Sequence, residues 1–402
     1  MQAKLTFFLA WAALVAGLIL PTIAPPVGNV ISIALMLLGL FWLRGSPATR
    51  DILRQPSVWL SLLAGGVLLI ALIPTARAPI DILAIFVLTP LWLAAPHTGL
   101  LHRFGARLTP WLIGVLSLIG AAGGAAIAGF DVLVLGLPRG GYSVNNPIHL
   151  ADLSLMLGFM ALVGLLDKRR GNLMFLLGPG FALATIWFSG SRGPLMAFIA
   201  LLAVGGVTMA WLTLRPKQAL ALIVLGCLGL GVAGFGISHS GAAGRLGEIV
   251  NLNMMLTGNT RDDSTNERLS MYRSAVGAFL ASPVYGHGMM DYTTKAAEYA
   301  PPGRSYTPSG HLHNDLADFA VIGGSLGLLS YALLLLAPLA GGFAAQGRYR
   351  RPAIYLGIVA PTGYFAMGLT NAMFGILAQT TLYAVVLSLI AALAISGREP
   401  TS

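Results

Sequence analysis

The chain has very little charge: charged residues make up 9% of its 402 positions, whereas hydrophobic residues make up 56%. An ordinary soluble domain carries about 25% charged residues, and it has no means of burying so much apolar surface. The scarcity of charge therefore excludes a water-soluble enzyme and a disordered protein. The single cysteine, Cys227, excludes an intramolecular disulfide and a cysteine-rich zinc or iron–sulfur site.

The apolar residues gather in runs long enough to cross a bilayer, which takes about 20 residues of helix. The sequence predicts an all-α integral membrane protein of about twelve transmembrane helices, the first of them retained. The expected spans are roughly residues 5–24, 28–43, 57–74, 82–96, 110–130, 148–166, 172–190, 194–213, 219–237, 319–345, 353–371 and 375–396. We expect helices one to nine in 1–237, a large external loop region with short helices in 238–318, and helices ten to twelve with a short tail in 319–402.

The formal net charge of +10 has a topological explanation. If the N-terminus is cytoplasmic and the spans alternate, most of the 24 lysines and arginines fall in inside loops and most of the 14 acidic residues fall outside. This is the positive-inside pattern of membrane proteins. It predicts a multi-pass protein with both termini in the cytoplasm, and it gives no support to nucleic-acid binding.

The spans are nearly free of charge at their centres, and the polar residues gather in three external places. The first is the loop 131–147, which contains Arg139 and Asn146. The second is the turn 189–194, in which Arg192 stands alone between two helices. Arg192 has two interpretations: it reaches to lipid headgroups, or it binds an anion together with backbone N–H groups at the start of the next helix.

The third place is the external region 238–318. Ser264-Thr265-Asn266-Glu267 fits a capping box and predicts a helix from about 265 to 281, ended by Ser282-Pro283. Helical spacing predicts that its buried stripe consists of Leu269, Tyr272, Val276, Phe279 and Leu280. Arg268 and Arg273 lie on opposite borders of that stripe. Periodicity does not choose between them, and a solvated arginine is the default for either.

Two histidines end this external region, in His311-Leu312-His313-Asn314-Asp315, directly before an apolar helix. One interpretation is a metal site, because His311, His313 and Asp315 alternate as ligands on a strand do. The better one is a general base, because imidazole titrates near neutral pH and accepts a proton from a hydroxyl. Asp315 or Asp318 would then orient the imidazole.

Four motifs carry a resemblance that covers roughly residues 130–390. They are Arg139-Gly140 with Asn146-Pro147; Gly190-Ser191-Arg192-Gly193; Arg268 to Tyr272 followed by the turn 283–288; and His313-Asn314 entering a helix. In their order and external placement they resemble the motifs of the O-antigen ligase and polymerase superfamily of bacterial envelope glycan transferases. Tyr272 stands where tryptophan is common in that family, and Ala317 stands where a leucine usually follows the His-Asn pair.

The resemblance implies an inverting, metal-independent glycosyltransferase without a cofactor, on the periplasmic face of the bacterial inner membrane. Its donor would be a glycan on undecaprenyl pyrophosphate, and its acceptor a sugar hydroxyl. By the same resemblance His313 matches the catalytic base, and Arg192 and Arg268 match pyrophosphate-binding arginines. The candidates for supporting roles are Arg139, Asn146, His311, Asn314, Asp315 and Tyr272.

The acceptor divides the family. A ligase transfers the glycan to lipid A–core, whereas a polymerase transfers it to another carrier-linked repeat. The single dominant external loop before the His-Asn helix favours a ligase, with an O-antigen or exopolysaccharide polymerase as the alternative. A function of another class is a lipid-linked glycan transporter, which would place polar groups along a central path; the sequence shows no such series.

Overall fold

The computed structural model describes residues 2–44, 48–144, 146–214, 263–301 and 306–397. These ranges form helices and no strands, and nine of their helical segments are long and apolar enough to cross a membrane. The expected all-α class of multi-span protein is therefore confirmed. The expected span 219–237 and the first part of the external region 238–318 lie outside the described residues.

The nine segments correspond closely to expected spans. They are Pro25–Leu43 (α3), Pro56–Thr75 (containing α5, Pro56–Leu72), Pro79–His102, Pro110–Leu133 (α9), Pro147–Leu166 (containing α10, Pro147–Ala161), Asn172–Ser189 (containing α11, Leu177–Ser189), Arg192–Thr213 (α12), Asp315–Ala344 (α18) and Leu377–Ser396 (α20). The remaining α-helices outside these segments are Gln2–Leu18 (α1), Leu20–Ile23 (α2), Thr49–Leu53 (α4), Asp263–Ala281 (α16), Tyr292–Ala297 (α17) and Arg350–Gly368 (α19).

Two expected spans differ from the described structure. The first, 5–24, is divided into the short apolar helix α1 and the single turn α2, which has Pro21 in its first turn. The fourth, 82–96, belongs to a segment of short pieces: α6 (Pro79–Leu83), α7 (Thr89–Trp92) and α8 (Ala94–His102). Proline lacks an N–H and begins helices more readily than it continues them, which explains these breaks. Helix α19 matches the span 353–371 but is not among the nine apolar segments.

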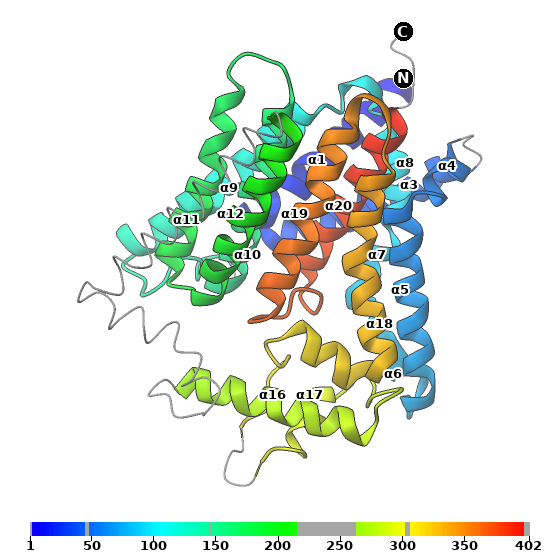
Figure 1. The fold of residues 1–402 in the computed structure, drawn as a ribbon, viewed down its shortest axis with the longest axis vertical. Coiled ribbons are helices and arrows are strands. Elements are labelled where there is room, and N and C mark those ends of the chain that lie inside the picture. Colours follow the sequence, from blue (N-terminus) through cyan, green and yellow to red (C-terminus); the bar gives the residue numbers. More distant parts are fainter. Residues whose placement is uncertain (1, 45–47, 145, 215–262, 302–305, 398–402) are drawn as a thin grey trace.

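Helix α20 forms the centre of the bundle and is buried along nearly its whole length. Helix α18 packs against α5 and α19, and α10 packs against α9 and α11, so the other long helices surround this centre (Figure 1). Large apolar side chains point outward; Phe41 is 77% exposed and Trp187 is 80% exposed. A bundle with an apolar exterior fits a lipid environment.

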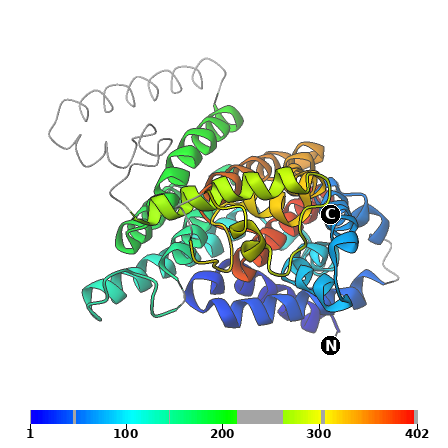
Figure 2. The ribbon, with the colours of Figure 1, turned by 90° about the horizontal axis from the view of Figure 1, so that it is seen from below.

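The two ends of the bundle differ. The start of α1 and the end of α20 lie at one end, which we call the basic end, whereas α16 and α17 lie across the opposite end (Figures 1 and 2). At the basic end the Arg107 guanidinium lies 4.6 Å from the centre of the Phe7 ring, and α19 begins with Arg350 and Arg351. The loops expected inside the cell and those expected outside therefore lie at opposite ends.

Helix α16 buries a different face from the expected apolar stripe. Its buried residues are small or slender: Ser270, Met271, Ser274, Ala275 and Ala278. Val276 and Leu280, predicted to be buried, are 60% and 70% exposed. The stripe prediction was wrong because α16 packs closely on α17 and α18, and that approach selects small side chains over large apolar ones.

Helix α18 is sharply kinked at Gly324, where φ is 59°. The kink separates a short external part from the long membrane part, and it leaves backbone groups without helical partners. The turn after α16 supplies them: the N–H groups of His287 and Gly288 donate to the carbonyls of Val321 (2.8 Å) and Ile322 (3.0 Å). In the other direction, the N–H groups of Ser325 (2.8 Å) and Leu326 (3.3 Å) donate to the carbonyls of Pro283 and Val284.

Two glycines make this contact possible. A Cβ on Gly324 would lie 2.6 Å from the carbonyl carbon of Val284, and a Cβ on Gly286, whose φ is 66°, would lie 2.5 Å from the Val321 carbonyl oxygen. Only glycine combines a positive φ with such close backbone approach. The turn 283–288, singled out by the sequence, therefore completes the hydrogen bonding of the kink in α18.

We expect Gly324→Ala to destabilise the folded protein by more than about 2 kcal/mol, because it adds a strained φ to a steric clash with backbone. The measurement is thermal unfolding of the purified protein in detergent. Gly66→Ala is the matched control: Gly66 lies within α5, and a Cβ there meets nothing within 4 Å, so its thermal midpoint should not fall. An unchanged midpoint for Gly324→Ala would contradict the role given to the kink.

Candidate functional site

The turn 311–314, the histidine turn, is fixed by hydrogen bonds at both ends. Asn314 is the N-cap of α18, and its side-chain oxygen accepts a hydrogen bond from the N–H of Ala317 at 3.1 Å. The Asp318 carboxylate accepts one from the N–H of Leu312 at 2.8 Å. Between them His313 has φ 54°, which is rare for a residue other than glycine. Such strain persists only where the surroundings enforce it, so this turn gives His313 one defined position.

The two imidazoles of this turn are in contact. Their ring centres lie 4.2 Å apart with the rings nearly perpendicular. The backbone N–H of His313 donates a hydrogen bond to Nδ1 of His311 at 3.2 Å. Nδ1 of His311 is therefore an acceptor, and a neutral His311 carries its proton on Nε2. Nδ1 of His313 is buried and has no hydrogen-bond partner among the described residues.

Both histidines are uncharged at neutral pH. Burial lowers the pKa of His313 to about 3, and neighbouring positive charge from His311 and Arg268 lowers it in the same direction. A smaller contribution to the His313 pKa comes from His149, near the start of α10. Burial lowers the pKa of His311 to about 4, again with help from Arg268. A neutral imidazole is the form that accepts a proton.

Helix α16 brings Arg268 and Tyr272, one turn apart, to this turn. The Tyr272 hydroxyl lies 3.0 Å from the carbonyl oxygen of His313 and 3.3 Å from that of Leu369. Burial raises the pKa of Tyr272, so the phenol keeps the proton with which it donates. Arg268, unlike Arg273, is among the charges that act on both imidazoles. The structure thus distinguishes the two arginines that periodicity left equivalent.

The loop between α19 and α20, residues 369–376, is a component of the site that the sequence did not single out. The Asn314 side chain donates to the Leu369 carbonyl at 3.2 Å. Asn371 donates from its side chain to the Asp152 carboxylate of α10 at 2.8 Å. A Cβ on Gly193 would collide with the Thr370 hydroxyl. The loop therefore touches the histidine turn, α10 and the start of α12; its only signal was a short polar interruption between two apolar runs.

The expectation that Asp315 or Asp318 orients an imidazole does not hold in the structure. Oδ1 of Asp315 accepts hydrogen bonds from the N–H groups of Met373 (2.8 Å) and Phe374 (3.3 Å), and Asp318 holds the backbone of Leu312. Both carboxylates bind backbone amides instead, because buried N–H groups in turns need acceptors. Asp315 thus supports the loop 369–376.

The first two external motifs also meet. Nε of Arg139 donates to the Ser189 carbonyl at 2.6 Å, and Nη2 of Arg139 donates to the Ser191 hydroxyl at 3.0 Å. Gly190 between them has φ 61° and ends α11, and exposed Arg192 is the first residue of α12. Arg139 therefore stabilises the turn that presents Arg192. Asn146 caps α10 by accepting a hydrogen bond from the Ile148 N–H at 2.8 Å.

The alternative metal site gains no support from the geometry. Among the described residues, no three His, Cys, Asp or Glu side chains are placed to hold one metal ion. The carboxylate of Asp315, one of the three ligands considered, binds the backbone of the loop 369–376 instead.

Comparison with known proteins gives one family match. Residues 174–332 match the model of a family described as O-antigen ligase. The matched stretch includes the Arg192 turn, α16, the turn 283–288, the histidine turn and the kink of α18. No curated protein sequence matches the chain.

We expect His311 and His313 to contribute stability that is lost as the pH falls from about 6.5 toward 4. The unfolded chain protonates its histidines near pH 6.5, whereas folded His311 and His313 stay neutral until much lower pH. At these two residues the unfolded state thus binds more protons across this window, so their protonation favours unfolding on acidification. Thermal midpoints at pH 5 and 7 measure the effect. The double variant His311→Gln/His313→Gln should show a smaller difference between the two midpoints; an equal difference would contradict the assignment.

Proposed function

We propose that this membrane enzyme, a member of the O-antigen ligase family through residues 174–332, transfers a glycan from undecaprenyl pyrophosphate to a sugar hydroxyl of lipid A–core. The observation that carries the proposal is the gathering of Arg268, Tyr272 and a neutral His313 at one place. A base beside a guanidinium is what glycosyl transfer from a pyrophosphate requires.

The proposed location is the bacterial inner membrane, with the active site in the periplasm. The loops at the basic end carry most of the lysines and arginines, and positive charge remains on the cytoplasmic side of membranes. The histidine turn lies at the opposite end, with α16 (Figure 1). Both chain termini are then cytoplasmic, and α16 and α17 lie across the periplasmic ends of the membrane helices (Figure 1).

In the proposed reaction His313 is the general base. Its neutral imidazole removes the proton of the acceptor hydroxyl as that oxygen attacks the anomeric carbon of the glycan. The bond between the anomeric carbon and the pyrophosphate oxygen breaks on the opposite face, so the configuration inverts. The electron pair of that bond leaves with the lipid pyrophosphate, and the proton remains on His313 until it passes to water or to the leaving group.

The developing negative charge needs fixed positive charge nearby. Arg268 on α16 and Arg192 at the start of α12 are the proposed partners of the pyrophosphate, since guanidinium groups bind phosphate oxygens in a bidentate manner. Arg192 acts with the N-terminal end of its helix, which favours anions. Two arginines in this role make a divalent cation unnecessary. The bound pyrophosphate also raises the pKa of His313 and strengthens it as a base.

A ligase is favoured over a polymerase because one large external segment precedes the His-Asn helix, although both would use the same chemistry. An O-antigen or exopolysaccharide polymerase remains the alternative. A lipid-linked glycan transporter is less consistent with the site, because the arginine and histidines gather around one turn instead of following a path through the bundle.

We expect His313→Ala to lower glycan transfer at least about 100-fold, the usual contribution of a general base. The measurement is the lipopolysaccharide banding pattern of a deletion strain complemented with the variant. Bare core with long glycan retained on the carrier would indicate a ligase, whereas core capped by one repeat would indicate a polymerase. A variant that is inserted normally and still transfers glycan well would contradict the role of His313.

Arg268 and Arg273, on the same helix, form a matched pair. We expect Arg268→Ala to lower transfer about 100-fold through loss of electrostatic stabilisation, and Arg268→Lys to restore only part of it. Arg273→Ala should have a mild effect. Transfer rates with purified donor and acceptor measure both variants, and a severe loss from Arg273→Ala with little from Arg268→Ala would contradict the proposed orientation of α16.

A further inference from the structure

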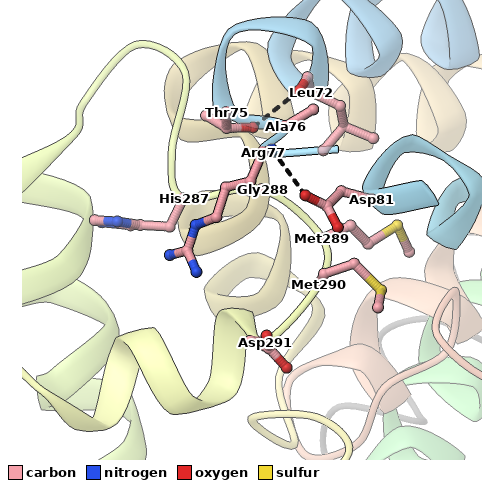
Figure 3. Close-up of a pocket in the computed structure, with 10 residues that line it drawn as sticks. All are labelled: Leu72, Thr75, Ala76, Arg77, Asp81, His287, Gly288, Met289, Met290 and Asp291. Carbon is pink, nitrogen blue, oxygen red and sulfur yellow. Dashed lines mark hydrogen bonds between the residues drawn. The ribbon is translucent and has the colours of Figure 1, made fainter. Parts of the chain in front are cut away.

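We propose that a second external pocket, lined by Arg77, Asp81 and Asp291, binds a saccharide unit of one of the two glycan substrates. The proposal rests on the proposed transferase function. The pocket lies beside the kink of α18, between the external end of α5 and the residues that follow the turn 283–288 (Figure 3). Nothing in the matched family stretch assigns it, because Arg77 and Asp81 lie outside residues 174–332.

The pocket is built from two distant parts of the chain held in a fixed relation. The N–H groups of His287 and Gly288 donate to the carbonyls of Val321 and Ile322, which anchors one wall to α18. A Cβ on Gly288 would lie 3.1 Å from the Thr75 hydroxyl oxygen of the other wall. Since α18 packs on α5, both walls rest on the same pair of helices, and the pocket is preformed.

The polar groups in the pocket remain available to a ligand. The Arg77 guanidinium is exposed and bonds none of the described residues, and Figure 3 shows it extended away from its own turn. Asp81 uses only one oxygen, Oδ2, to accept from the N–H groups of Arg77 (2.8 Å) and Ala78 (3.0 Å). The side chain of Asp291 bonds none of the described residues. One guanidinium group and two carboxylates therefore line the opening of the pocket.

This set of groups fits sugar hydroxyls better than phosphate. Two carboxylates and one guanidinium give the pocket a net negative charge, which repels a pyrophosphate. A hydroxyl both donates and accepts, so it pairs with carboxylates and with arginine. Leu72, Met289 and Met290 add apolar surface for the C–H face of a sugar ring, in the mixed composition typical of ligand pockets.

The φ of Asp291 is 56°, in the left-handed region, which aspartate adopts more readily than most residues other than glycine. His287 has a different role, because its Nε2 lies 2.8 Å from the Ala278 carbonyl and joins the turn to α16. The ligand-binding groups are thus Arg77, Asp81 and Asp291.

The position suits an extended glycan reaching to His313. The anchoring carbonyl of Val321 lies six residues along α18 from Asp315, about 9 Å of helix, and Asp315 lies two residues after His313. A short oligosaccharide with one end at His313 can therefore reach the pocket. Either glycan has this chemistry: the core oligosaccharide of the acceptor or the glycan of the donor.

Direct binding tests the pocket and identifies the source. The probes are the host strain's core oligosaccharide freed of lipid A, and its glycan repeat released from the carrier, each titrated by calorimetry into the full-length protein in detergent micelles. We expect Arg77→Ala and Asp291→Asn each to raise the Kd of one probe about tenfold, or about 1.4 kcal/mol. Asparagine tolerates the left-handed backbone, so Asp291→Asn removes charge without adding strain.

The control is Lys295→Ala, on the nearby helix α17, whose exposed ion pair with Glu298 lies outside the pocket lining; it should leave the Kd unchanged. Weakened binding of the core probe assigns the pocket to the acceptor, and weakened binding of the repeat assigns it to the donor. Unchanged affinity of both pocket variants, or failure of both probes to bind the wild-type protein, would overturn the proposal.

Failure of the pocket and failure of the transferase function give different results. His313→Ala should lower transfer at least about 100-fold, whereas in that variant probe binding should still depend on Arg77, because His313 does not line the pocket. Probe binding that depends on Arg77 in a protein whose deletion leaves lipopolysaccharide unchanged would retain the pocket and reject the function. Transfer that depends on His313, with a glycan KM unaffected by the pocket variants, would reject the pocket alone.

Discussion

The backbone contact at Gly324 is the constraint on which the external face depends. A membrane helix that kinks sharply leaves N–H and C=O groups without partners, and unpaired backbone groups are costly in a low-dielectric setting. Here the turn 283–288 donates two hydrogen bonds to α18 and accepts two from it. The same contact accompanies the change of direction of α18. It also anchors Gly288, which is followed by Met289 and Asp291 in the lining of the second pocket. The histidine turn and the second pocket are thus positioned by one piece of backbone geometry.

The buried carboxylates near the histidines accept hydrogen bonds from amide groups that hold the surrounding turns in place. Asp315 holds the N–H groups of Met373 and Phe374, Asp318 holds Leu312, and Asp152 holds Asn371. Each one fixes a turn next to the histidines, so the imidazoles are positioned through backbone and not by a carboxylate partner. This arrangement leaves Nδ1 of His313 buried and without a hydrogen-bond partner among the described residues.

Sequence patterns succeeded where one physical requirement dominated. Long apolar runs became helices because a backbone in lipid must satisfy its own hydrogen bonds. Patterns failed where packing partners decided the outcome. The apolar stripe of α16 was wrong at Val276 and Leu280 because α16 packs on α17 and α18 through another face, which contains Met271, Ala275 and Ala278. The sequence did not predict that the loop 369–376 belongs to the site. The loop bonds to the site mainly through backbone groups, and backbone groups have no sequence signature.

The sequence by itself determined that the chain is an all-helical membrane protein, with its basic loops separated from a polar face that contains Arg192, Arg268 and His313. Hydropathy and charge suffice for this, since the bilayer acts on each segment separately. The tertiary structure decided which polar groups meet: Arg268 beside the imidazoles, Asp315 with the loop 369–376, and Arg77 with Asp291 in the second pocket. These pairings join residues far apart in the chain, and they depend on the direction of each helix after its turn, which for α18 is set by the φ of a single glycine.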